Sequence, residues 1–224
     1  MLKKLLKKLL KAFGKTYSPD HSIPDKLIVS IFSRRLNMFI RGIIKTRKKI
    51  FLGKGVTIYN KSNFNFGKGC TVEKFTTLDC YAKEPICFGN AVKIGSFSTV
   101  STTSHLSKYG KGLSIGNHSA IGEYAYFGCS GGVTIGNDVI MGQYISFHSE
   151  NHNFSDKTKI IRDQGVTSKG IILGNNIWVG SKVTFLDGCV VGDNCVVAAG
   201  AVVKGIFPSN VIIGGVPAKV LKQI

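Results

Sequence analysis

Two histidines and a glutamate stand close together near the middle of the chain, in the polar stretch Phe147–Asp156. His152 follows His148 by four residues and Glu150 by two. An imidazole has an unperturbed pKa of about 6.5, so it can accept or release a proton at neutral pH. These residue types suit proton transfer, and the elements around them must explain how they are held.

The surrounding sequence has a period of six residues. Apolar side chains recur at every sixth position in the C-terminal part: Leu173, Val179, Phe185, Val191, Val197 and Val203. The same spacing begins at Leu52 and runs through several phases, with short insertions expected at the corners. This period fits neither an α-helix nor an alternating strand, and so short a unit cannot bury its own apolar residue. The sequence therefore predicts an all-β solenoid whose interior is filled by the repeating position.

The repeat stops after the polar stretch and resumes at Leu173. Residues 153–170 are too many and too polar for the corner of a coil, so we expect them to protrude as a loop. Long loops on a compact scaffold are more often functional than decorative. His152 stands at the base of this loop.

The repeating units resemble a known family. Segments such as Ile115–Ser119 and Val191–Cys195 are similar to the hexapeptide repeat of left-handed parallel β-helix proteins, and the resemblance covers about residues 50–221. In that family three hexapeptides make one triangular coil, and Gly or Asn takes the turn positions that a Cβ atom disfavours.

Within this superfamily the chain resembles the bacterial O-acetyltransferases, which include galactoside, maltose, O-antigen and capsule acetyltransferases. Three segments carry the similarity, in the family's order: Val133–Val139 through Asn151–His152, Asn176–Ser181 and Gly214–Val220. The resemblance implies transfer of an acetyl group from acetyl-CoA to a hydroxyl. His152 would then be the general base that removes the acceptor proton.

A second group would have to hold the tautomer of His152. Glu150 is one candidate, if it shares a strand face with His152, and a backbone carbonyl is another. We expect no catalytic role for His148.

The resemblance also implies a donor site along the C-terminal repeats. Trp178 would help to line the active site. Ser181 and Ala199 would contact the pantetheine arm of CoA through polar backbone groups. Basic side chains would lie near the nucleotide phosphates, namely Lys204, Lys219 and Lys222. In the family, a neighbouring subunit of a homotrimer completes the site.

One position departs from the family. Gly122 stands where galactoside acetyltransferases carry an acceptor-binding asparagine, with Glu123 and Tyr124 beside it. The identity of the acceptor therefore does not transfer. Together with the basic N-terminal region described next, this favours a sugar hydroxyl of a surface polysaccharide or of its lipid-linked precursor.

Positive charge is concentrated at the N-terminus. Residues 1–50 hold 14 Lys or Arg against two Asp, whereas the rest of the chain holds 16 basic and 10 acidic residues. Residues 2–11 place leucines and lysines on different faces of a helix, as in helices that lie on membranes. Residues 25–49 mix apolar and basic side chains, with apolar runs too short to span a bilayer.

We therefore predict a basic, amphipathic, helical extension at residues 1–49, followed by a β-helix acyltransferase domain at residues 50–221. A secretory signal is disfavoured, because charges interrupt the apolar residues near the start. Two interpretations of the extension stay open: peripheral contact with an anionic membrane from the cytoplasmic side, and capping of the first coil. Nucleic-acid binding is disfavoured, because the basic residues alternate with aliphatic rather than stacking aromatic side chains.

The six cysteines form no Cys-x-x-Cys pair and show no spacing typical of metal ligands. Cys70, Cys189 and Cys195 fall at the small inward position of their repeats, which predicts buried, reduced thiols in a cytoplasmic protein. We accordingly expect neither a metal site nor thiol catalysis.

Two functions of other classes remain as alternatives. A γ-type carbonic anhydrase shares the fold and binds zinc through three histidines, for which only His118, His148 and His152 are suitable here. That family spaces two ligands five residues apart, whereas His148 and His152 are four apart. The other alternative is a β-helix scaffold without catalytic activity.

Overall fold

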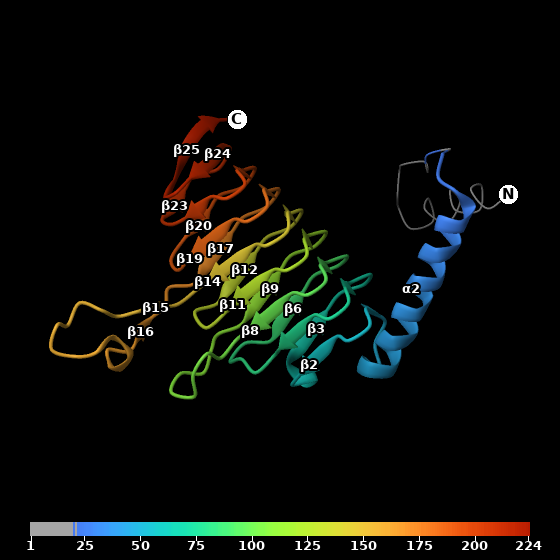
Figure 1. Cartoon of the computed structure of the whole chain (residues 1–224), viewed down its shortest axis with the longest axis horizontal. Helices are drawn as coiled ribbons and strands as arrows, with labels where there is room; N and C mark the ends of the chain where they lie inside the picture. Colours follow the sequence, from blue (N-terminus) through green and yellow to red (C-terminus); the bar gives the residue numbers. More distant parts are fainter. Residues whose placement is uncertain (1–19, 21) are drawn as a thin grey trace.

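The structure is a computed structural model that describes residue 20 and residues 22–224 (Figure 1). In these ranges, helix α2 (Asp25–Thr46) precedes a solenoid of short strands. The predicted amphipathic helix at residues 2–11 lies outside the described residues.

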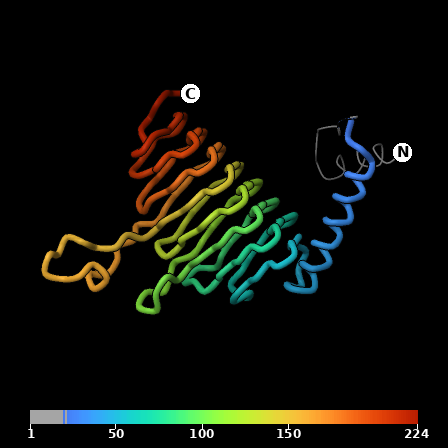
Figure 2. The backbone as a smooth tube through the Cα atoms, in the orientation of Figure 1, coloured from blue at the N-terminus to red at the C-terminus, as the bar shows by residue number. Residues whose placement is uncertain are grey.

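Each full coil of the solenoid adds one strand to each of three parallel sheets. The backbone trace shows the coils stacked one on another (Figure 2). The first sheet consists of β1 (Phe51–Leu52), β4 (Thr71–Val72), β7 (Lys93–Ile94), β10 (Ala120–Ile121), β13 (Ile140–Met141), β18 (Trp178–Val179), β21 (Val196–Val197), β24 (Val211–Gly215) and, antiparallel, β25 (Ala218–Gln223). The second sheet consists of β2 (Thr57–Tyr59), β5 (Thr77–Asp79), β8 (Thr99–Ser101), β11 (Tyr126–Gly128), β14 (Ser146–His148), β19 (Thr184–Leu186) and β22 (Val202–Val203). The third sheet consists of β3 (Phe64–Phe66), β6 (Ile86–Phe88), β9 (Leu113–Ile115), β12 (Val133–Ile135), β17 (Ile171–Leu173), β20 (Val190–Val191) and β23 (Ile206–Phe207). This is the predicted left-handed parallel β-helix.

The repeating apolar position fills the interior. All six residues of the C-terminal series from Leu173 to Val203 are at most 1% exposed. Along the second sheet, Phe127, Phe147 and Phe185 are in register, and their stacked rings have centroids 4.9 Å apart at each step. That distance equals the ordinary spacing of hydrogen-bonded strands, so each coil covers the apolar residue of the previous one.

One corner of the solenoid departs from the expected turn chemistry. Between the first and second sheets, the left-handed turn position is held in four coils by aromatic residues, Phe75, Phe97, Tyr124 and Tyr144, with φ between 55° and 59°. Glycine or asparagine usually takes this conformation, because a Cβ atom is crowded there. Successive rings stack with centroids 5.4, 5.1 and 4.9 Å apart, and aromatic stacking of this kind offsets the backbone cost.

The three cysteines predicted to be buried are indeed buried, each at most 1% exposed. Burial, with a smaller contribution from the nearby Asp187 carboxylate, raises the pKa of the Cys189 thiol to about 12. Burial likewise raises the pKa of Cys80 to about 12. Both thiols therefore stay protonated at neutral pH, and a protonated thiol is not a nucleophile.

Helix α2 covers the start of the solenoid. Its own residues Met38 and Gly42 are buried. Gly42 approaches the backbone of Ile50 too closely for any larger residue to fit. Arg41 and Lys45 donate hydrogen bonds to backbone carbonyls of the first coil, each with a donor–acceptor distance of 2.6 Å. Among the described residues, no helix has the length and apolar content needed to cross a bilayer.

Two insertions protrude from the same corner of the solenoid, between the second and third sheets (Figure 1). Residues 102–112 separate β8 from β9, and residues 149–170 separate β14 from β17. The second insertion contains the loop predicted at residues 153–170. It forms a hairpin of β15 (Asn151–His152) and β16 (Val166–Thr167), with a 3₁₀ turn at Ile161–Asp163; a second 3₁₀ turn lies at Lys61–Asn63.

Candidate active site

His152 lies on the first strand of the loop hairpin, opposite Val166. The next residue, Asn153, extends the pairing, because its backbone N–H donates to Gly165 at 3.0 Å and its side-chain amide donates to Gln164 at 3.0 Å. The His152 side chain is exposed. A hydrogen-bonded strand thus presents an imidazole to solvent at the base of the loop.

Asp187 of the solenoid accepts hydrogen bonds from both ends of this loop. Its Oδ1 accepts the backbone N–H groups of Lys169 and Gly170 at 2.7 and 2.8 Å, and its Oδ2 accepts the side-chain amide of Asn151 at 3.2 Å. The carboxylate is only 9% exposed. Because Asn151 precedes His152 directly, Asp187 helps to set where the imidazole lies.

A surface cavity of about 390 Å³ lies between the loop and the solenoid. Its lining residues are Asn151, His152, Asn153, Phe154, Ser155, Thr167, Leu186, Asp187 and Lys204. The structure therefore brings together two of the predicted site residues, His152 and Lys204, and adds a buried carboxylate, Asp187. It offers a proton-accepting group and a cation in one open space.

Glu150 faces a different neighbour from the one proposed. Its Oε1 accepts a hydrogen bond from the Ser104 hydroxyl at 2.9 Å, and its Oε2 lies 3.5 Å from the Lys108 ammonium. Lys108 also donates to the Ser168 hydroxyl at 2.6 Å. Among the described residues, no hydrogen bond joins Glu150 to His152. Glu150 precedes β15, so the alternation of faces along a strand does not bring it beside His152.

The contacts of Lys108 link the two insertions at this corner. Through this ammonium group, the loop of residues 102–112 touches Glu150 before the hairpin and Ser168 after it. The sequence predicted short insertions at the corners of the coils but not that this one supports the histidine loop. A role for Glu150 in holding the tautomer of His152 stays a prediction.

The predicted pantetheine-binding residues lie at another corner of the same chain. Ser181 and Ala199 occupy turns between the first and second sheets, where the Gly200 N–H donates to the Ser181 carbonyl at 2.9 Å. Trp178 lies on β18 of the first sheet with 59% of its surface exposed. His152 instead lies at the corner between the second and third sheets, so one chain does not bring these groups together.

The remaining predicted residues are also dispersed. Lys219 and Lys222 are exposed on β25, at the C-terminal edge of the first sheet. His148 points outward from β14, with its ring centroid 5.7 Å from that of Tyr126. His118 lies on a turn between the third and first sheets. The described residues contain no group of three His, Cys, Asp or Glu side chains that could hold a metal ion.

The comparisons with known proteins agree with the coil geometry. Residues 170–205 match the family model described as bacterial transferase hexapeptide (six repeats). Over these residues the chain carries the hexapeptide repeat of that family. This match covers the C-terminal coils, which contain Trp178, Ser181, Ala199 and Lys204.

Relatives of this hexapeptide-repeat chain are named as acetyltransferases. It is 30% identical over 180 residues to a probable acetyltransferase of Mycobacterium tuberculosis, and the alignment covers 80% of this chain and 52% of that protein. It is 25% identical to the Escherichia coli protein WbbJ, named for lipopolysaccharide biosynthesis and O-acetyl transfer, over 70% of this chain and 81% of that one. It is 34% identical to the galactoside O-acetyltransferase of E. coli over 41% of this chain and 44% of that enzyme. The chain thus spans about half the length of two of these relatives.

Solved structures share the fold. A mutant of the N-acyltransferase AntD from Bacillus cereus, in complex with coenzyme A and an amino-sugar nucleotide, has a TM-score of 0.56 at 20% identity, covering 78% of this chain and 80% of that one. The UDP-N-acetylglucosamine acyltransferase of Campylobacter jejuni has a TM-score of 0.53 at 14% identity, over 78% of this chain and 68% of that one. At these identities the likeness concerns the fold alone.

Proposed function

We propose that this protein is an acetyl-CoA-dependent O-acetyltransferase that modifies a sugar hydroxyl. The observation that carries the proposal is the placement of His152, an exposed imidazole on a hydrogen-bonded hairpin, in one cavity with Lys204. The names of the relatives, including one for galactoside and one for lipopolysaccharide, support the reaction and the acceptor class.

In this reaction His152 takes the proton of the acceptor hydroxyl while its oxygen attacks the acetyl carbonyl. A C–O bond forms, the C–S bond to CoA breaks, and the proton passes from His152 to the departing sulfur. Acetyl-CoA supplies the activated acetyl group as co-substrate. An imidazole suits both proton transfers because its pKa lies near the operating pH.

The cations of the C-terminal coils suit a donor that carries phosphates. Lys204 lines the His152 cavity, and Lys219 and Lys222 are exposed on β25. Ammonium groups make charge-assisted hydrogen bonds with phosphate oxygens. We therefore assign CoA binding to these lysines together with Trp178, Ser181 and Ala199.

We further propose that the working enzyme is a homotrimer. Within one chain the histidine and the predicted pantetheine-binding residues lie at different corners of the prism, so a single chain does not complete the site. A neighbouring copy that turns its first-to-second-sheet corner toward the His152 loop would complete it. Sedimentation equilibrium tests the assembly, and mixing a His152→Ala chain with a Trp178→Ala chain tests whether active sites are shared between copies.

The finer proposal for the acceptor is a glycan attached to a membrane lipid on the cytoplasmic face. The exposed apolar and basic side chains of α2 support it. The decisive experiment incubates the purified chain with acetyl-CoA and candidate oligosaccharides, follows thiol release, and identifies acetylated product by mass spectrometry. Absence of CoA binding would favour a scaffold, and zinc-dependent hydration of CO₂ would favour a carbonic anhydrase.

A further inference from the structure

Helix α2, which lies at the N-terminal end of the solenoid (Figure 1), carries a second apolar face made of exposed side chains. Five apolar residues of this face have large exposed fractions: Val29 56%, Leu36 60%, Ile40 46%, Ile43 42% and Ile44 74%. Successive residues of a helix advance by about 100°, so positions 29, 36, 40 and 43 form one stripe. The inner face, with Met38 and Gly42, is already used against the first coil. A continuous exposed apolar stripe of this kind marks an interaction surface.

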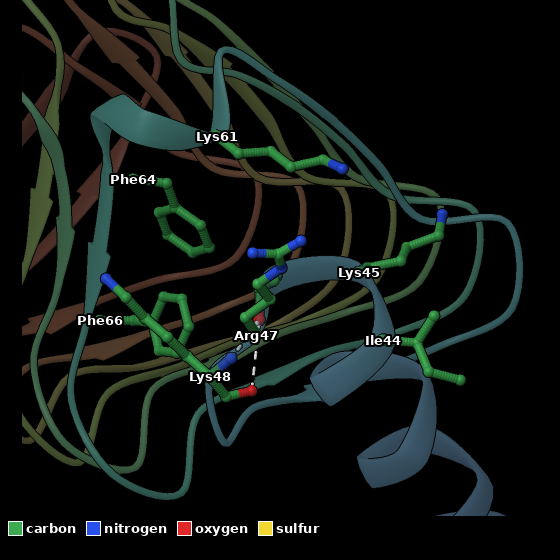
Figure 3. A pocket seen from close by; sticks show the side chains of 8 residues that line it. Ile44, Lys45, Arg47, Lys48, Lys61, Phe64 and Phe66 are labelled. Carbon is green, nitrogen blue, oxygen red and sulfur yellow. Dashed lines mark hydrogen bonds between the residues drawn. The ribbon is translucent and has the colours of Figure 1, made fainter.

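A basic pocket opens at the C-terminal end of this helix (Figure 3). Its volume is about 180 Å³ and it is lined by Ile44, Lys45, Thr46, Arg47, Lys48, Lys61, Phe64 and Phe66. Four of these residues are cationic and none is acidic. The side chains of Arg47, Lys48 and Lys61 extend around the two phenylalanine rings, and the Lys48 ammonium lies 5.6 Å from the Phe66 ring centroid.

Stabilisation of the helix alone does not explain this cluster. A cation in the last turn complements the helix dipole, and Lys45 meets that need while donating to the Val56 carbonyl. Lys61 belongs to the next segment of the coil, not to the helix. Arg47 adopts a left-handed conformation, with φ of 56°, at a helix end where glycine is usual. Cations from two separate segments thus converge on one pocket, an arrangement that suits the binding of an anionic group.

We propose that α2 lies flat on an anionic membrane, with its outer stripe in the acyl boundary and the phosphate group of a lipid in the basic pocket. This inference extends the proposed function, because it names the surface through which the enzyme would reach a lipid-linked acceptor. Ile44 lines the pocket and is the most exposed apolar residue of the helix, so the apolar and phosphate-binding parts adjoin. That arrangement matches a lipid, whose headgroup phosphate adjoins its acyl chains.

Charge favours a membrane over a second copy of this chain. Residues 25–49 hold eight Lys or Arg against Asp25 alone; Arg35, Arg41 and Lys45 donate hydrogen bonds to the first coils, and the other five are Lys26, Arg34, Arg47, Lys48 and Lys49. Two copies of this surface would bring like charges together, whereas the anionic leaflet of a membrane complements them.

The test measures co-sedimentation of the full chain with vesicles of phosphatidylcholine alone and with added phosphatidylglycerol. The wild-type chain is expected to bind the anionic vesicles and to be released by salt. The double variant Arg47→Ala, Lys61→Ala should bind them about 10- to 30-fold more weakly, since each cation near an anionic leaflet is worth a factor of about five. A matched control, Lys68→Ala with Lys83→Ala, removes the same charge from exposed sites on the solenoid. It should weaken binding to the anionic vesicles by less than threefold.

A stripe variant, Leu36→Ser with Ile40→Ser, should also bind anionic vesicles at least about 10-fold more weakly while it leaves circular dichroism and acetyl transfer to a soluble acceptor unchanged. The proposal is overturned if either double variant binds like wild type. It is also overturned if inorganic phosphate occupies the pocket without any preference for vesicles, or if the stripe variant changes the oligomeric state instead of membrane binding. Vesicle binding can be read even if the chain transfers no acetyl group, so failure of the proposed function would be seen separately.

Discussion

Replacing Asp187 by alanine should disconnect the histidine loop from the solenoid. The substitution removes the acceptor for the backbone N–H groups of Lys169 and Gly170 and for the side-chain amide of Asn151. Lys169 and Asn151 are exposed, so water can replace their lost bonds, whereas Gly170 is buried. The dominant cost is therefore one buried N–H group without an acceptor, about 1–3 kcal/mol.

This cost should appear mainly as local opening of the loop. The solenoid core does not depend on the hairpin, and segments with few buried contacts open below the global unfolding free energy. At about 2 kcal/mol, the population of the open loop rises about 30-fold. A displacement of the catalytic group by about 1 Å can cost about 100-fold in rate. We therefore expect kcat/KM for acetyl transfer to fall by up to about 30-fold if the open loop becomes the major state, and by up to about 100-fold if the imidazole is also displaced in the closed loop.

The assay compares kcat/KM from thiol release with amide hydrogen exchange at residues 165–170. Asp187→Asn should be intermediate, because its remaining oxygen can still accept the two backbone N–H groups but its amide would face the Asn151 amide. Asp193→Ala is the matched control, since the Asp193 carboxylate accepts the Asn175 N–H at 2.6 Å in a turn distant from the loop. If Asp187→Ala keeps kcat/KM within about threefold of wild type while the loop exchanges faster, loop position does not limit the reaction.

Two further predictions concern the same site, and a third concerns the buried thiols. His152→Ala should lower the transfer rate by about 100- to 10,000-fold without changing the thermal midpoint, whereas His148→Ala should retain most activity; a folded His152→Ala chain with normal turnover would remove the general base from the mechanism. Lys204→Ala should weaken CoA binding in calorimetry and reduce its salt dependence, and unchanged binding would place the phosphates elsewhere. Because their pKa values are raised to about 12, Cys80 and Cys189 should stay unlabelled by iodoacetamide at pH 8 in the native chain and become reactive only as the pH rises toward those values or on unfolding; rapid native labelling would contradict their burial.

The architecture could be predicted from the sequence because the same packing contact recurs in every coil of the solenoid. Each inward residue, such as Phe147, packs on its equivalents one coil away, Phe127 and Phe185. The signal therefore accumulates over many units, and a six-residue period has few other structural explanations. Insertions interrupt this rule, and so the sequence located the loop after His152 without indicating what the loop contacts.

The sequence did not predict which residues support the histidine loop, because that support comes from side-chain contacts between the two insertions. Lys108 meets Glu150 and Ser168 across separations of 42 and 60 residues, respectively, through side chains that no periodicity relates. Glu150 lies close to His152 in sequence, which made it a candidate for holding the imidazole. Its carboxylate accepts a hydrogen bond from the Ser104 hydroxyl of the other insertion, a contact that sequence proximity to His152 does not indicate.

A signal for Asp187 was present in the repeat itself. The position two residues after the inward residue of the second sheet is buried in coil after coil and is occupied there by small side chains: Cys80, Thr102, Cys129 and Ser149. Asp187 is the carboxylate in this column, one coil beyond Ser149. Burying an ionised carboxylate is costly unless hydrogen bonds compensate it, so a charged residue at a position otherwise kept small requires donors. Here the donors come from the two ends of the insertion that carries His152. In this solenoid, the one carboxylate among the small buried residues of that column, Asp187, therefore lies where the insertion is attached. The same attachment holds the strand that carries His152.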